Sequence, residues 1–234
     1  MGNYVFDREG LNESLEEDDR EDFGKHIIPG MKKQDKDIYA YIFPDYWADI
    51  GQIGDYFDFN MAYAAGNGPI DLEKNIIKTH LRHLPGALIE DSDVKYTQLS
   101  AGDKIRDSEL MLVMAGYQVT VESGSEIDHT MLLGADRNTR FQKYSTRIKD
   151  SRLSYVIADK NVWIEDCDIG PHNGSPEERI EAFVKAGLQP YTVNDNGSIT
   201  GDFHIDPGTG IITIRKQREP DSDKKMPLLY KIRA

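Results

Sequence analysis

Helical spacing of apolar residues marks three segments in the first third of the chain. They are residues 11–22, 24–30 and 53–61. Leu11 and Leu15 lie four residues apart in an acidic stretch, so they share one face of the first helix. Ile53, Phe57 and Met61 repeat that spacing in the third. We therefore expect a helical pattern up to about residue 65.

Two short runs, one before the first helix and one between the second and third, have the make-up of strands. Residues 3–6 and 38–43 are rich in β-branched and aromatic side chains, and Pro44 and Asp45 follow the second run as turn formers. Together with the helices they predict an α/β region. Because the first run opens the sequence with nothing before it, we expect the chain to start inside a domain.

The pattern changes after the turn-forming cluster at residues 66–69. From residue 87 onward, apolar side chains recur about every five or six residues: Val94, Leu99, Ile105 and Met111, then Ile157, Trp163 and Ile169. Such spacing is typical of a parallel β-helix, in which one side chain per face points inward on each coil. The glycine that often follows the inward position is mostly absent, so periodicity alone favours an irregular β-sandwich equally. The predicted domains are residues 1–65, a linker at 66–86, and an all-β domain at 87–234.

Charge and composition exclude several classes of partner. The formal net charge of −13 is unsuited to a nucleic-acid or anionic-membrane surface, because both require a basic face. There is no run of 18 apolar residues, and Cys167 is the only cysteine, so we expect no membrane span and no intrachain disulfide. Cys167 is expected to have a packing role. A reducing compartment, the cytoplasm or a plastid, fits best.

Aromatic and acidic residues come together in three short segments. Tyr4 lies in the opening run, Asp22 and Phe23 follow the first helix, and Trp47 and Asp49 precede the third. Aromatic rings stack on the apolar face of a hexose, and carboxylates accept hydrogen bonds from its hydroxyl groups. A core position for Trp47 and a helix N-cap for Asp49 are the alternatives.

The segments MGNYVF, DFGKHIIP and AYIFPDYWADIG resemble those of glucose-1-phosphate adenylyltransferase, also called ADP-glucose pyrophosphorylase, in the same order. VIADKNVWI and GIITIRK resemble, more loosely, the β-helix of that family, so the resemblance runs from residue 1 to about 216. It implies the C-terminal remnant of a Rossmann-like nucleotidyltransferase domain followed by a left-handed parallel β-helix. The reaction implied is ATP plus glucose 1-phosphate giving ADP-glucose and pyrophosphate, for glycogen or starch synthesis.

The resemblance also implies roles for individual residues. Tyr4, Asp22, Phe23 and Trp47 would line the glucose 1-phosphate pocket, and Asp49 would be one of two aspartates that hold Mg²⁺. Lys160 and Lys216 match positions at which some members bind a phosphorylated activator. The β-helix would assemble the chain into a homo- or hetero-oligomer.

The sequence departs from the family pattern in ways that affect catalysis. The glycine-rich loop that binds the ATP phosphates is absent, as is the second metal aspartate. We therefore expect ATP to bind only with a nucleotide-binding half, and the chain to be inactive alone. A polar insertion at about 174–202 separates the two activator lysines.

Two other functions are compatible with the sequence. One is a non-catalytic β-helix subunit that assembles with a full-length enzyme and modulates it. The other is a hexapeptide-repeat acyltransferase, for which His129, His172 and His204 are available as bases, although nothing in the first 65 residues suits acyl transfer.

Overall fold

The computed structural model describes residues 3–17, 20, 22–78, 82–135, 145–170, 174–185, 187–194, 199–215 and 229–230. The chain forms two compact units, Met1–Asp49 and Ile50–Ala234, which we call the helical unit and the β-helix unit. Each is described by itself. The predicted boundaries at residues 65 and 87 stay a prediction.

The helical unit contains α1 (Arg8–Glu17), a π-helix η1 (Phe23–Ile27) and α2 (Ile28–Lys33). The first helix begins earlier than its apolar spacing indicates, because the Asp7 carboxylate accepts the backbone N–H groups of Glu9 and Gly10 at 3.0 Å each. Ile27 and Met31 are buried and form the apolar centre of the unit. The two predicted helices of this unit are thus present.

The strand predictions for residues 3–6 and 38–43 are wrong. Both segments are extended, but neither joins a sheet, and Val5, Tyr41 and Ile42 are more than four-fifths exposed. β-Branched and aromatic residues favour an extended backbone, whereas a strand also needs a neighbour for its ladder of hydrogen bonds. The described part of the helical unit supplies no such neighbour.

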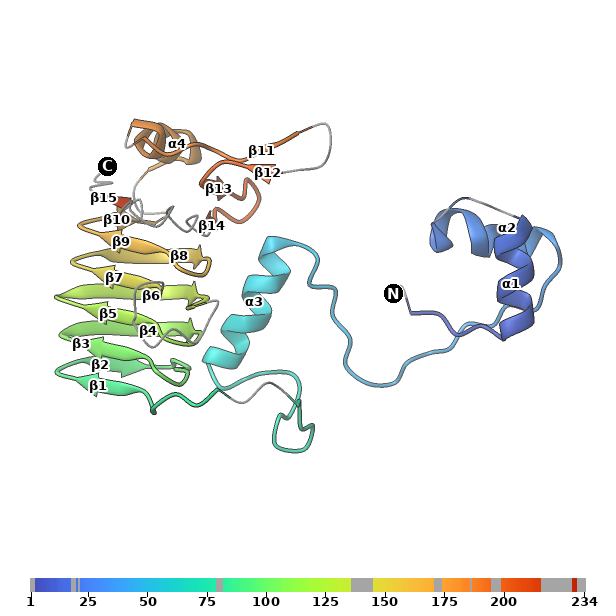
Figure 1. Cartoon of the computed structure of the whole chain (residues 1–234), viewed down its shortest axis with the longest axis horizontal. Coiled ribbons are helices and arrows are strands. Elements are labelled where there is room, and N and C mark those ends of the chain that lie inside the picture. Colours follow the sequence, from blue (N-terminus) through green and yellow to red (C-terminus); the bar gives the residue numbers. More distant parts are fainter. Residues whose placement is uncertain are drawn as a thin grey trace. The chain divides into compact units, whose positions relative to one another are not determined.

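The β-helix unit is a stack of parallel strands (Figure 1). One sheet consists of β1 (Leu88–Glu90), β3 (Lys104–Arg106), β5 (Thr120–Glu122), β7 (Arg147–Lys149), β9 (Trp163–Glu165) and β15 (Leu229–Tyr230). The other contains β2 (Asp93–Lys95), β4 (Ser108–Ala115), β6 (Ser125–Leu132), β8 (Arg152–Ala158), β10 (Asp168–Ile169), β14 (Ile212–Ile214) and β13 (Phe203–Ile205), of which only β13 is antiparallel to its neighbour.

The register of these strands builds one inward column per face. Ile89 pairs with Ile105 and Ile105 with Val121, so equivalent residues of adjacent coils are typically sixteen positions apart. Ile105, Val121 and Ile148 are fully buried in this column. The predicted repeat was shifted by one residue in part: the main core contains Leu110, Val156 and Ile164, not their predicted neighbours Met111, Ile157 and Trp163.

The coils turn at residues with a left-handed backbone. Asp107, Asp150 and Asp166 have φ between 45° and 53° at one corner, and Leu112 and Tyr155 have φ of 52° and 55° at the next. Aspartate tolerates this region better than most residues because its short polar side chain can hydrogen-bond locally. The turns therefore form without the glycines that the sequence lacks.

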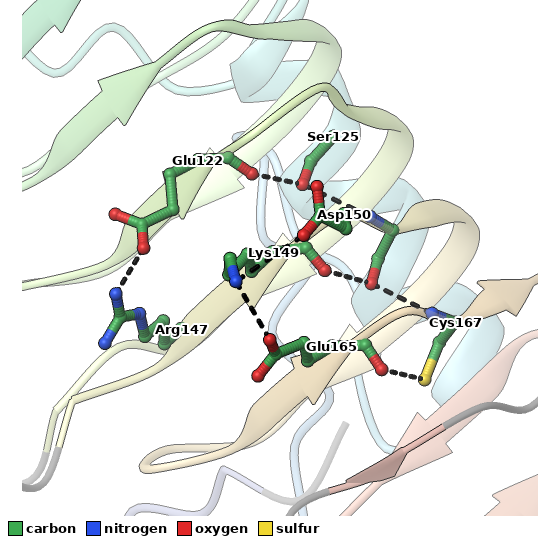
Figure 2. Close-up of polar contacts among 8 residues, drawn as sticks. Glu122, Ser125, Arg147, Lys149, Asp150, Glu165 and Cys167 are labelled. Atoms are coloured by element: carbon green, nitrogen blue, oxygen red, sulfur yellow. Dashed lines mark hydrogen bonds and ion pairs between the residues drawn. The ribbon is translucent and has the colours of Figure 1, made fainter.

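A ladder of small polar side chains runs along the first of these corners, and Figure 2 shows its part from Ser125 to Cys167. It consists of Ser92, Ser108, Ser125, Ser151 and Cys167. Ser151 is typical: its hydroxyl donates to the carbonyl of Lys149 at 2.6 Å and accepts the backbone N–H of Cys167 at 3.1 Å. Each rung thus satisfies buried backbone groups that the turn leaves unpaired.

The thiol of Cys167 is the last rung of this ladder. It is buried, and its Sγ donates to the carbonyl of Glu165 at 3.2 Å (Figure 2). The Cys167→Ser substitution should therefore change the free energy of unfolding by less than about 1 kcal/mol, since a hydroxyl makes the same bond. Cys167→Val, which removes the donor, should cost about 1–2 kcal/mol. Urea denaturation of the three proteins tests this, and equal losses for both variants would contradict it.

Two helices complete the β-helix unit. The helix α3 (Ile53–Ala64) lies along β4 and β6 (Figure 1), where Phe57 and Met61 pack on Met131, Ile157 and Ile211. The helix α4 (Pro176–Lys185) covers one end of the stack.

The predicted polar insertion contains this second helix and the short hairpin of β11 (Thr192–Val193) and β12 (Ile199–Thr200). Phe183 of α4 is buried in the main core and stacks on Phe203 with ring centroids 4.5 Å apart. The insertion is therefore partly structural, because it supplies an end cap of the kind that stacked coils require.

Candidate functional site

Three aromatic rings gather in the helical unit. Tyr4 and Phe23 stack with centroids 6.2 Å apart and an interplanar angle of 23°. Phe6 lies against both, at 6.1 Å from Tyr4 and 5.6 Å from Phe23. The Tyr4 side chain is 44% exposed, so the cluster presents aromatic surface to solvent. This arrangement offers an apolar face of the kind on which a sugar ring stacks.

The carboxylate of Asp22 stands beside these rings because Asp22 precedes Phe23 and caps η1. Its Oδ1 accepts the backbone N–H of Lys25 at 2.8 Å, and its Oδ2 lies 3.6 Å from the Lys25 ammonium. The N–H bond, with the lysine charge, lowers the pKa of Asp22 below the ordinary value of 3.8. Asp22 is therefore ionised at neutral pH and suited to accept hydroxyl hydrogens.

Trp47 and Asp49 are not brought into this cluster. Both lie in the exposed, extended segment that ends the helical unit, and Trp47 is 45% exposed. Among the residues described for this unit, Trp47 makes no ring contact with Tyr4, Phe6 or Phe23. The core alternative for Trp47 is thus wrong. The capping alternative for Asp49 is also wrong, because Gln52 is the residue that precedes α3.

The described residues offer an incomplete fit to a metal ion. They contain no group of three or more histidine, cysteine, aspartate or glutamate side chains that could hold one. Asp49 would thus contribute a single carboxylate. Mg²⁺ is usually held by one or two carboxylates together with phosphate oxygens and water. Of the described residues, Asp49 would therefore supply one part of a magnesium site.

The two predicted activator lysines differ in what the structure describes. Lys160 is exposed on the loop after β8, where its backbone N–H donates to the Asp159 carboxylate at 2.7 Å. Lys216 lies outside the described residues. Their proximity stays a prediction.

Sequence reasoning missed Phe6 and Lys25 as members of the aromatic and acidic cluster. Phe6 had a usable signal: Tyr4 and Phe6 are two residues apart in an extended run, which puts them on the same side. Lys25 had none, because its place beside Asp22 depends on the tight turn at the start of η1.

Comparison with known families finds two matches along the chain. The nucleotidyl transferase family model matches residues 1–66, and the GLGC left-handed parallel beta-helix domain model matches residues 82–188. All five predicted sugar-site residues lie in the first match, and Lys160 lies in the second. The predicted fold class is confirmed as a segment similar to nucleotidyl transferases followed by a left-handed parallel β-helix. No described helix is long and apolar enough to cross a bilayer. In this order, the two matches support a GLGC-like ADP-glucose pyrophosphorylase family for the chain.

Proposed function

We propose that this chain carries the glucose 1-phosphate site and the β-helix of a glucose-1-phosphate adenylyltransferase. The observation that carries the proposal is the stacked pair of Tyr4 and Phe23 next to the ionised Asp22, within the segment similar to nucleotidyl transferases. The hexose would stack on the exposed ring surface, and Asp22 would accept its hydroxyl hydrogens. Trp47, on its extended segment, would close over the sugar.

In the proposed reaction, an oxygen of the sugar phosphate attacks the α-phosphorus of ATP. The new P–O bond gives ADP-glucose, and the bond to the leaving pyrophosphate breaks. The residues of this chain contribute by holding the sugar phosphate in place for that attack. Mg²⁺, held in part by Asp49, would neutralise charge on the phosphate oxygens. We assign ATP binding to a nucleotide-binding half outside this chain.

Intrinsic tryptophan fluorescence tests the sugar site. Glucose 1-phosphate should change the emission saturably, because Trp47 is exposed whereas the Trp163 indole donates to the carbonyl of Ser145 at 2.9 Å. Trp47→Phe should abolish the optical change and weaken binding two- to tenfold, as expected for one lost indole contact. Trp163→Phe is the matched control and should keep the signal. No saturable change in the wild type would contradict the proposed sugar site.

A modulating subunit without catalysis is the second candidate. It is favoured by the stacked parallel coils and by the fact that the described residues contain no group of three side chains that could hold a metal ion. ATP formation from ADP-glucose and pyrophosphate separates the two. Activity that appears only when a separately expressed nucleotide-binding half is added supports the catalytic role. Inactivity with that half, together with tight binding to an intact homologous enzyme, supports modulation.

A further inference from the structure

The turn between β13 and β14, residues 206–210, is built around one carboxylate. Asp206 Oδ1 accepts the backbone N–H of Gly208 at 3.1 Å, and both the N–H and the hydroxyl of Thr209 at 2.7 Å each. The hydroxyl bond, together with the N–H bonds, lowers the pKa of Asp206 below 3.8, so the carboxylate is charged at neutral pH. The bonded hydroxyl therefore sets the direction of the Thr209 methyl group.

That methyl group points at the first turn of α3. A β-carbon added at Gly54 would lie 2.9 Å from Thr209 Cγ2, whereas packed carbon atoms stay about 3.5–4.0 Å apart. Gly54 is the second residue of α3, and alanine is a better helix former than glycine. The glycine thus leaves room for a close contact between the turn and the helix.

The helix α4 holds the same turn through a buried arginine. Arg179 is 5% exposed, and its Nη1 donates to the carbonyl of Gly210 at 3.2 Å. Gly210 closes the turn, because its own N–H donates to the carbonyl of Asp206 at 2.8 Å. Taking a guanidinium out of water costs free energy that only its remaining bonds offset, so Arg179 is committed to this contact.

The helix α3 directly follows the segment that carries Trp47 and Asp49. Residues 50–52 join Asp49 to Ile53, the first residue of the helix. An exposed, extended segment has little packing of its own, so its path depends on where its ends are held. The start of α3 is one of those ends.

We propose that Thr209 and Arg179 are positioning residues, which fix the start of α3 and thereby the segment of Trp47 and Asp49. This inference rests on the proposed sugar-phosphate site. It also gives the insertion that contains α4 a part in that site, through contacts that all lie within the β-helix unit.

Hydrogen exchange of the whole chain tests the contact by a reversal of sign. Gly54→Ala should speed exchange of the α3 amides at residues 56–60 about tenfold, because the new β-carbon overlaps the Thr209 methyl. Thr209→Ser removes that methyl and keeps the hydroxyl. In the Thr209→Ser background, Gly54→Ala should instead slow exchange about threefold, since alanine favours the helix. Thr209→Val, which keeps a methyl group, should not bring this reversal.

Tryptophan emission titrated with glucose 1-phosphate tests the positioning role. Gly54→Ala should weaken binding about threefold, because the sugar must then order a looser segment, and Thr209→Ser should restore the affinity. Arg179→Met should weaken binding similarly, whereas Arg179→Lys, which can still donate to Gly210, should weaken it less.

The outcomes separate the two proposals. Equal exchange effects of Gly54→Ala in both backgrounds would overturn the Thr209 contact. Faster α3 exchange with unchanged sugar affinity would overturn the positioning role and leave the sugar site standing. No saturable binding by the wild type would refute the sugar site and the positioning role with it, whatever the exchange data show for the contact.

Discussion

Replacing Asp103 with asparagine should remove a loss of stability that the wild-type protein undergoes between about pH 4 and pH 7. Asp103 is fully buried, and its carboxylate accepts the backbone N–H of Val119 at 2.8 Å and that of Ser100 at 2.7 Å. Burial raises the pKa of Asp103 from 3.8 to about 7, although these N–H groups act in the opposite direction.

The sign of the pH effect follows from that difference. In the unfolded chain Asp103 releases its proton near pH 3.8, whereas the folded protein keeps it up to about pH 7. The stability contributed by this group is therefore fully present below pH 3.8 and declines as the pH rises toward 7. The folded-state shift of about three pKa units corresponds to about 4 kcal/mol over the whole window.

Urea denaturation at several pH values measures the effect. The Asp103→Asn protein should show a flatter dependence of unfolding free energy on pH than the wild type. It should also be less stable at low pH, by about 1–3 kcal/mol, because an amide cannot accept both N–H bonds. Asp91→Asn is the control, since Asp91 is an exposed corner residue. Parallel curves for wild type and Asp103→Asn would contradict the burial argument.

Truncation of Phe57 to alanine should cost about 3–5 kcal/mol, the range for removal of a buried aromatic side chain. Phe57 is 2% exposed, and its ring stacks on Tyr155 of β8 with centroids 6.1 Å apart. The cavity would lie between α3 and the outside of the coils. The inner column of Ile105, Val121 and Ile148 does not include this side chain.

The loss should therefore be local, and hydrogen exchange measures it. Amides of α3 should exchange much faster in Phe57→Ala, while those of β4, β6 and β8 remain slow. Asp58→Ala, an exposed neighbour on the same helix, is the matched control and should leave α3 protected. Unchanged protection of α3, or uniform acceleration through all the strands, would show that the helix and the coils are not coupled in this way.

The sequence predicted helices where α1, α2 and α3 lie because their signals are local, but it did not predict α4. Apolar spacing located α1, although the helix begins at Arg8 and not at residue 11, and Phe57 with Met61 marks the buried face of α3. Strand predictions failed for residues 3–6 and 38–43 because pairing depends on a neighbour that spacing cannot reveal. The same kind of limit shifted part of the coil register: Leu110 and Met111 are neighbours on one strand whose side chains point to opposite faces, and apolar spacing did not distinguish the inward one.

The candidate site was partly accessible from sequence for a related reason. Asp22 and Phe23 are adjacent in the sequence, Tyr4 stacks on Phe23 from beyond α1, and the family resemblance pointed to all three. The side chain of Lys25 is placed by an unusual π-helical turn that no periodicity reveals. Whether Trp47 and Asp49 act with the cluster depends on contacts along an extended segment, which residue types alone do not specify.

The end cap made by α4 has a consequence for how this molecule can change over evolution. Stacked coils differ little from one another, so duplicating or deleting one in the middle preserves the contacts of its neighbours. Phe183 and Phe203, by contrast, pack α4 on the end of the stack, where β13 runs antiparallel to its neighbour and so ends the parallel order. We therefore expect whole coils to be gained or lost within the stack. The last coil and the helix that caps it should be inherited together.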